Sequence, residues 1–138
     1  MAIPTTAFAH VRLTVSDIDR SRAFYEQVFD LPIAVQMPPD ADEATRDAYG
    51  FLFGGVIYQL GSCLLGLRPV ADDTFNENRT GLDHLSFAVA DRADLESAMA
   101  SLDEHGVPHG GIKDIGAGWI LEFRDPDNIA LEVYADKP

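Results

Sequence analysis

Two histidines and one glutamate, far apart in the sequence, are the residues of this chain best suited to bind a metal ion. His10 and His84 each open a stretch of alternating apolar and polar residues, and Glu132 lies within a third stretch. A carboxylate flanked by apolar residues in a strand is costly to bury unless a partner offsets its charge. A cation held by two imidazoles would supply that partner.

The stretches around the two histidines repeat each other. One runs from Ala9 to Asp17 and the other from Asp83 to Asp91, and both read His, then alternating apolar residues, then Asp. Such alternation is typical of a half-buried strand. In both stretches the histidine lies on the more polar face, opposite the apolar one.

A helix should follow each of these strands. Asp17 and Asp91 are predicted N-caps, because their carboxylates can accept backbone N–H hydrogen bonds. Apolar residues then recur at a spacing of about 3.6 residues. We expect the first helix to end near Asp30, and the second to end at His105 with Gly106 as a left-handed cap.

Three short strands should follow each helix, which gives two βαβββ modules and an α+β fold. The predicted strands are Ile33–Met37, Tyr49–Gln59, Cys63–Arg68, Val107–Lys113, Ala117–Arg124 and Ile129–Tyr134. Asp125–Asn128 is a turn sequence. We expect residues 38–47 to be a mobile loop over an opening and residues 71–80 to link the modules. The modules span residues 7–70 and 81–135 of one domain, residues 1–138.

These motifs together resemble a known family. They are His10-Val-Arg-Leu-Thr-Val followed by a helix reaching Phe24-Tyr25, His84-Leu-Ser-Phe-Ala-Val, and Asp125-Pro-Asp-Asn-Ile-Ala-Leu-Glu132. The pattern resembles the vicinal-oxygen-chelate superfamily, which comprises glyoxalases, bleomycin-resistance proteins and ring-cleaving dioxygenases, and it covers almost the whole chain.

The resemblance implies that the two modules form a cup-shaped, curved mixed β-sheet. It also implies that His10, His84 and Glu132 are the metal ligands. Two histidines and one carboxylate leave open positions on Fe(II), Mn(II), Ni(II) or Zn(II), where a substrate with adjacent oxygens can chelate the ion. The resemblance further implies a homodimer, in which His10 joins the two other ligands from the partner chain or from its own.

The sequence departs from each enzyme type of the family at one or more positions. Glyoxalases carry a fourth ligand where this chain has Gly66. Extradiol dioxygenases carry a Tyr where it has Phe123, and a His that residues 114–116 lack. Fosfomycin-resistance transferases carry a Thr where it has Arg12. The reaction therefore stays open among lyase, isomerase and dioxygenase chemistry, and Glu132 is the one candidate for a catalytic role.

Five further residues are predicted to bind substrate. Arg12 and Arg68 share strand faces with His10 and Gly66, where either can bind a substrate carboxylate or form an internal salt bridge. Phe53, Trp119 and Tyr134 are aromatic residues that either belong to the core or line the concave face of the cup.

Two functions follow from these expectations. The first is a divalent-metal enzyme that acts on a small oxygenated organic molecule chelated to the ion. The alternative is a metal-free protein that sequesters an antibiotic or an aromatic compound in the same cup.

Composition excludes some other classes. The formal charge is −13, from 10 Lys and Arg against 23 Asp and Glu. Such a surface repels the phosphate backbone, so we do not expect the protein to bind nucleic acids. The start of the sequence lacks a signal-peptide pattern, and no apolar run has the ~20 residues that span a bilayer. Cys63 is the sole cysteine, so no intrachain disulfide can form. We expect a cytoplasmic protein that does not bind membranes.

Overall fold

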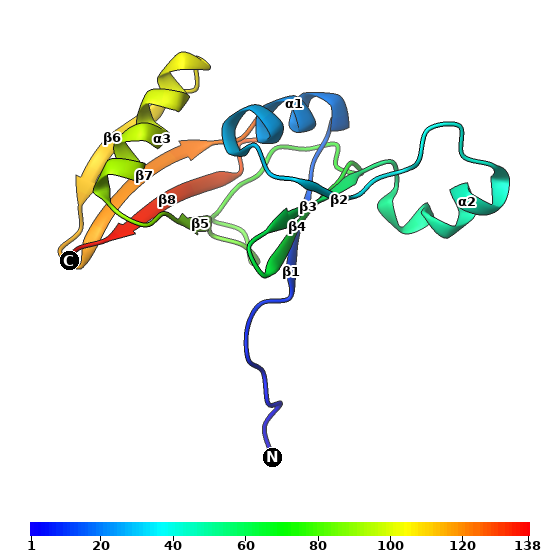
Figure 1. The fold of residues 1–138 in the computed structure, drawn as a ribbon, viewed down its shortest axis with the longest axis horizontal. Helices are drawn as coiled ribbons and strands as arrows, with labels where there is room; N and C mark the ends of the chain where they lie inside the picture. The colour runs from blue at the N-terminus through cyan, green and yellow to red at the C-terminus, as the bar shows by residue number, and fades with distance from the viewer. The chain divides into compact units, whose positions relative to one another are not determined.

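The alternating segments of the sequence form the strands of two four-stranded sheets (Figure 1). The computed structural model describes residues 1–138, which divide into two units, residues 1–72 and 73–138. The first unit contains β1 (His10–Thr14), α1 (Ile18–Phe29), β2 (Ile33–Val35), α2 (Glu43–Ala48), the 3-10 helix η1 (Gly50–Leu52), β3 (Val56–Leu60) and β4 (Cys63–Arg68). The second contains β5 (Leu85–Ala88), α3 (Arg92–Glu104), β6 (His109–Asp114), β7 (Gly118–Arg124) and β8 (Ala130–Asp136). The predicted α+β class with two βαβββ modules is confirmed.

Both sheets have the same permutation of strands. Their orders are β1-β4-β3-β2 and β5-β8-β7-β6. In each sheet the first strand of the unit pairs in parallel with the last one, and the other neighbours are antiparallel. The repeat seen in the sequence is therefore a repeat of topology.

The register of the parallel pairs aligns the two units residue by residue. Arg12 on β1 lies opposite Gly66 on β4, and Ser86 on β5 lies opposite Glu132 on β8. Arg12 and Ser86 each stand two residues after the histidine of their unit. Gly66 and Glu132 therefore occupy equivalent places in the two units.

Both long helices begin at the predicted aspartates. The Asp17 side chain accepts a hydrogen bond from the backbone N–H of Arg20 at 3.1 Å, and Asp91 accepts one from Asp94 at 2.9 Å. Each carboxylate satisfies a donor that the first turn of its helix leaves unpaired.

The helix ends also follow the sequence. α1 stops at Asp30, whose φ of 48° is left-handed. After α3, Gly106 has a φ of 68°, and the N–H of Val107 donates to the carbonyl of Leu102 at 2.8 Å. This 6→1 hydrogen bond with a left-handed glycine is a Schellman motif, which fixes where the chain leaves the helix for β6.

Each unit buries one face of its sheet against its long helix. In the second unit α3 contacts β6, β7 and β8. The buried apolar residues there are Leu95, Leu102, Leu121, Phe123, Ile129, Leu131, Val133 and Ala135. Leu131 and Val133 flank Glu132, so the strand alternation turns that carboxylate toward the opposite face of the sheet.

The turn before β8 is held by its own aspartate. Asp125 Oδ1 accepts hydrogen bonds from the backbone N–H groups of Asp127 at 2.9 Å and Ile129 at 2.8 Å. Asn128 completes the turn in a left-handed conformation, with a φ of 67°. This geometry confirms the predicted turn and fixes the start of the strand that carries Glu132.

The predicted strand Tyr49–Gln59 is wrong in its first half. Gly50–Leu52 form a 3-10 helix, and Phe53 and Gly54 follow with φ values of 52° and 82°. Two consecutive left-handed residues cannot continue a strand. Gly55 explains the bend, because a Cβ there would lie 1.9 Å from the carbonyl oxygen of Leu67. The chain reaches β3 only after this close approach.

The predicted loop over residues 38–47 is also partly wrong, because α2 begins at Glu43. Asp42 caps this helix by accepting a hydrogen bond from the N–H of Thr45 at 2.8 Å. Asp42 followed by Glu43 is a helix-start signal that the two prolines and the acidic composition of the segment obscured.

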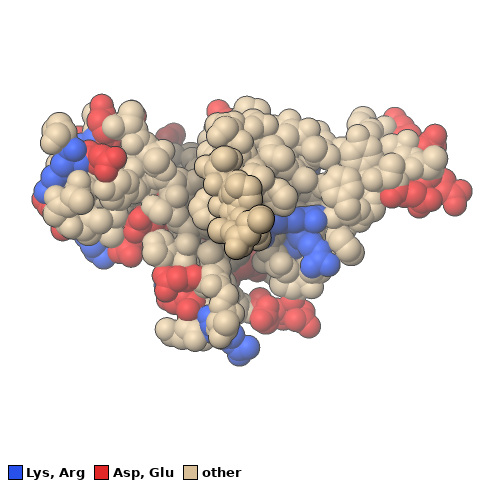
Figure 2. All heavy atoms as spheres, turned by 90° about the horizontal axis from the view of Figure 1, so that it is seen from below, with Lys and Arg blue, Asp and Glu red and all other residues tan.

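Acidic side chains are exposed around α2, at the right of Figure 2. Asp40, Asp42, Glu43 and Asp47 belong to this segment.

The helices are all too short or too polar to cross a bilayer.

Candidate metal centre

Two of the three predicted metal ligands lie side by side in the second unit. His84 immediately precedes β5, and Glu132 lies on β8, the parallel neighbour of β5. The distance from His84 Nε2 to Glu132 Oε2 is 3.8 Å. The parallel pairing of the first and last strands thus brings together residues that are separated by almost the whole unit.

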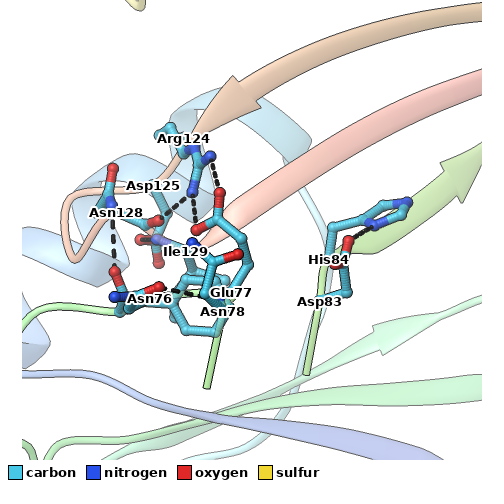
Figure 3. A network of polar contacts seen from close by, with 10 residues as sticks. Asn76, Glu77, Asn78, Asp83, His84, Arg124, Asp125, Asn128 and Ile129 are labelled. Atoms are coloured by element: carbon cyan, nitrogen blue, oxygen red, sulfur yellow. Dashed lines mark hydrogen bonds and ion pairs between the residues drawn. The ribbon is translucent and has the colours of Figure 1, made fainter. Parts of the chain in front are cut away.

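The imidazole of His84 is oriented by its neighbour in sequence. His84 Nδ1 donates to Asp83 Oδ1 at 2.5 Å, as Figure 3 shows. The bond to Asp83, together with the negative charge of Glu132, raises the pKa of His84 above its ordinary value. With the proton on Nδ1, the neutral ring presents the lone pair of Nε2 on the side of Glu132.

Glu132 is held from a different side. Ser86 Oγ donates to Glu132 Oε1 at 2.6 Å, so the other oxygen, Oε2, is the one that faces His84. The Glu132 side chain is 13% exposed and the His84 side chain 44% exposed. A half-open imidazole beside a mostly buried carboxylate is accessible to a small ion from solvent.

A cavity of about 360 Å³ opens beside these two residues. His109 and Arg124 also line its wall. Glu122 lies directly opposite Glu132 in the antiparallel register and also lines the cavity. Like charges directly opposite each other are unfavourable, and Lys113 offsets one of them by donating to Glu122 at 2.8 Å. Glu132 has no such cation among the side chains of its unit.

The donor atoms suit a divalent transition metal. A neutral imidazole nitrogen and a carboxylate oxygen are ligands of Fe(II), Mn(II), Ni(II) and Zn(II) alike. The carboxylate bond on the other ring nitrogen is the usual companion of a metal-binding histidine. No three His, Cys, Asp or Glu side chains of the structure form a complete metal-binding group. His84 and Glu132 therefore fit as two ligands of a site that needs a third.

His10, the third predicted ligand, belongs to the first unit. It lines a separate cavity of about 270 Å³ with Arg12 and Gly66. The aliphatic part of Arg12 lies over Gly66, where an added Cβ would be 3.0 Å from Arg12 Cγ. The place that a carboxylate takes in the second unit is thus taken here by the stem of an arginine.

Comparison with known proteins agrees with this reading of the fold. The family model described as the Glyoxalase/Bleomycin resistance protein/Dioxygenase superfamily matches residues 7–133. The chain belongs to this superfamily. The resemblance that the sequence motifs suggested is therefore confirmed.

Relatives in the superfamily carry several names. The chain is 30% identical over 135 residues to the catechol-2,3-dioxygenase of Bacillus subtilis. The matched region covers 96% of this chain and 42% of that enzyme. The chain is 28% identical over 127 residues to the metallothiol transferase FosB of Staphylococcus saprophyticus, covering 91% of the chain and 74% of the transferase. The chain spans less than half of the length of the Bacillus enzyme.

A solved structure shows the same fold. It is a glyoxylase/bleomycin resistance protein/dioxygenase domain from Frankia, 31% identical, with a TM-score of 0.76 over 96% of this chain and 93% of that one. Members of the superfamily with different chemistries thus share this architecture, and the fold alone does not select the reaction.

The other residues predicted to bind substrate contact partners that do not line either of the two cavities. Arg68 stacks on the Phe53 ring, with Cζ 4.3 Å from its centroid. Trp119 lies near two cations, Arg92 Cζ at 5.2 Å and Lys137 Nζ at 5.5 Å from its centroid.

Tyr134 donates to Asp136 at 2.7 Å, and this hydrogen bond raises the pKa of the Tyr134 phenol. Of the five residues predicted to bind substrate, Arg12 alone lines a described cavity. The substrate roles of the other four stay predictions.

Sequence reasoning missed three residues around the sites. Asp83 and Ser86 hold the two candidate ligands, and Phe51 lines the first cavity and accepts a hydrogen bond from Arg12 through its carbonyl. The sequence carried a signal for two of them, since Asp83 adjoins His84 and Ser86 shares its strand face. Phe51 is an aromatic residue of the kind expected either in the core or on the concave face, but the wrong strand predicted there hid the contact of its carbonyl with Arg12.

Proposed function

We propose that this chain is a divalent-metal-dependent enzyme of the glyoxalase/dioxygenase superfamily that acts on a small oxygenated organic substrate. In this proposal His84 and Glu132 bind the ion together with His10, from the same chain or from a partner copy. The arrangement of His84 carries the proposal: Asp83 occupies one ring nitrogen, and the other faces a carboxylate 3.8 Å away.

The protein's own residues would prepare the site. Asp83 keeps the imidazole in the tautomer whose Nε2 can act as a ligand. Ser86 fixes one oxygen of Glu132 and leaves the other free. A bound divalent ion would supply Lewis-acid activation of a chelating substrate oxygen. The adjoining cavity of about 360 Å³ has room for a small molecule.

The names of the relatives support a metal site but not one reaction. One is a dioxygenase and another is a metallothiol transferase. Fe(II), Mn(II), Ni(II) and Zn(II) all suit a site of two histidines and one carboxylate. We therefore propose neither a specific ion nor a specific substrate.

Metal content tests the proposal. The wild type, purified without chelator and then offered each of the four ions, should retain roughly one ion per chain, as expected for one site. His84→Ala should lose it. His105→Ala is the matched control, because His105 bonds to the carbonyl of Ser101 in its own helix and should retain the ion.

The alternative is a metal-free protein that sequesters an aromatic or antibiotic compound. The absence of a complete three-ligand group within either unit favours it. A wild type that retains none of the four ions would support this alternative and contradict the enzyme. The homodimer and the cytoplasmic location stay predictions, and light scattering on the purified protein tests the first.

A further inference from the structure

The cavity of the first unit carries the opposite charge from the equivalent place in the second unit. In the second unit the paired residues are Ser86 and Glu132, and in the first they are Arg12 and Gly66. Arg12 and Ser86 each stand two residues after the histidine of their unit, and each lies opposite its partner on the last strand of the unit. The equivalent pair of backbone positions therefore presents a carboxylate from the last strand in the second unit and a guanidinium from the first strand in the first unit.

Gly66 is what allows the arginine to lie there. The Cγ and Cδ atoms of Arg12 would be 3.0 and 3.6 Å from a Cβ at Gly66, so the stem occupies the space that a side chain on β4 would fill. Nη2 of Arg12 donates to the carbonyl of Phe51. The guanidinium is thus positioned from two sides before any ligand arrives, which reduces the entropy lost on binding.

The guanidinium also lacks a charged partner. Arg12 forms no ion pair with a carboxylate of the structure, although the chain has 23 acidic residues. Its Nε is buried without a hydrogen-bond partner. A buried N–H without a partner is unfavourable, and an anionic oxygen at this group would relieve that cost.

The rest of the cavity is mostly apolar. Val11, Phe51, Ile57 and Leu64 line it beside His10, Arg12 and Gly66, and its volume is about 270 Å³. One positioned guanidinium in an apolar cavity of this size matches a small organic anion that has an apolar body.

We infer that the cavity of the first unit binds the carboxylate or a similar anionic group of a small apolar organic acid through Arg12. Gly66 makes room for the site, because a Cβ there would already crowd the arginine stem at 3.0 Å and a larger side chain would compete with it for the same space. The inference deepens the proposed function by naming the substrate class. Binding of the acid to Arg12 does not depend on the proposed function, but the description of the acid as a substrate does.

Phenylacetate and phenylacetamide form the test pair, since they share the ring and the size but differ in charge. Each is titrated into the full-length protein, before and after dialysis against EDTA, and followed by amide chemical shifts in NMR spectra. Phenylacetate should bind in both states and shift the amides of Arg12 and Gly66, and phenylacetamide should bind at least about tenfold more weakly.

Arg12→Gln should weaken phenylacetate binding by about tenfold or more, to the level of the amide. Arg12→Lys keeps the charge but loses the planar fork, and should fall between the two. Arg46→Gln is the matched control, because it removes the same charge from the same unit, where Arg46 bonds to the carbonyl of Ala41 outside the cavity. Its affinity for phenylacetate should equal that of the wild type.

Three results would overturn the inference. One is the absence of phenylacetate binding to the wild type, and another is equal affinity for the acid and the amide. The third is binding that disappears with EDTA and is unchanged in Arg12→Gln, which would assign the carboxylate to a bound metal. Binding that survives EDTA and depends on Arg12 supports the inference even in a protein that retains no ion, so the two proposals can fail separately.

Discussion

At the scale of single residues, the properties of the site depend on the contacts of its two candidate ligands. Asp83 bonds to the ring nitrogen of His84 that faces away from Glu132, and Ser86 bonds to one oxygen of Glu132. Neither residue would touch the ion. Both fix which donor atoms point at it, and this orientation normally contributes to metal affinity.

Replacing Asp83 by Ala should therefore weaken metal binding without unfolding the protein. The loss should be about tenfold to a hundredfold in affinity, because the imidazole can then rotate and change its tautomer. Competition titration against a chromogenic chelator measures the change. Asp73→Ala provides the control, since Asp73 is an exposed carboxylate of the same unit. Equal affinities of the wild type and Asp83→Ala would show that Asp83 has no orienting role.

A second residue-scale prediction concerns the bend before β3. Gly55→Ala places a Cβ 1.9 Å from the carbonyl oxygen of Leu67, which requires the backbone to move. We expect a destabilisation of about 2 kcal/mol or more. At Gly50 an added Cβ would meet no atom within 4 Å, so Gly50→Ala should change the free energy of unfolding by less than about 0.5 kcal/mol. Urea denaturation compares the two variants, and similar midpoints would refute the steric account.

At the scale of elements, the segment before β5 is tied to the turn before β8. Arg124 Nη2 donates to Glu77 Oε1 at 2.7 Å and Arg124 Nη1 donates to the carbonyl of Asn128 at 3.0 Å (Figure 3). The side chain of Asn128 donates to the carbonyl of Phe75 at 3.1 Å. These bonds connect the segment that leads to β5, the strand after His84, with the turn that leads to β8, the strand that carries Glu132.

This network should give the protein an acid-sensitive component of stability. The hydrogen bonds from Arg124 lower the pKa of Glu77 from 4.5 to about 2. Because the pKa of Glu77 is lower in the folded state than its unfolded value of 4.5, ionised Glu77 stabilises the fold at pH values above 4.5. This contribution is lost as the pH falls from 4.5 toward 2. Glu77→Gln should remove this component, so its stability should decline less steeply over that range. Urea midpoints measured against pH test it, and parallel curves for the two proteins would contradict it.

The elements show how far the sequence could predict the fold. The helix caps and the turn before β8 are formed by contacts between residues that are close in the sequence, so local patterns were enough to predict them. These features are at Asp17, Asp91, Gly106 and Asp125. The bend at Phe53 depends on Gly55 lying against Leu67, a contact between segments that pair only in the folded sheet. Local patterns cannot report such a contact, and the predicted strand there was wrong for that reason.

The candidate site divides in the same way. The repeat of strand patterns singled out His84, and the family resemblance implied that it and Glu132 meet; parallel pairing of the first and last strands is what brings them together. Arg12 was predicted to bind substrate, but no local pattern indicates that its stem fills the space over Gly66. That arrangement depends on the register between β1 and β4.

At the scale of the whole molecule, the chain contains one topology twice with different residues at matching positions. A few side chains at matching positions are enough to make the two units chemically different. The second unit presents the cation-binding pair of His84 and Glu132, and the first presents the guanidinium of Arg12. Each proposal concerns one unit: His84 and Glu132 as ligands of the ion in the second, and Arg12 as the binder of an anionic group in the first. The ion is the part on which the enzymatic account depends.

The number of imidazoles on the bound ion tests that account most directly. Pulsed electron paramagnetic resonance on the Mn(II)-loaded protein, with its histidines labelled with ¹⁵N, counts the coordinating ring nitrogens. The account predicts couplings from two imidazoles in the wild type, and from one in either His10→Ala or His84→Ala. A wild-type spectrum without imidazole couplings, or one that neither substitution changes, would contradict it.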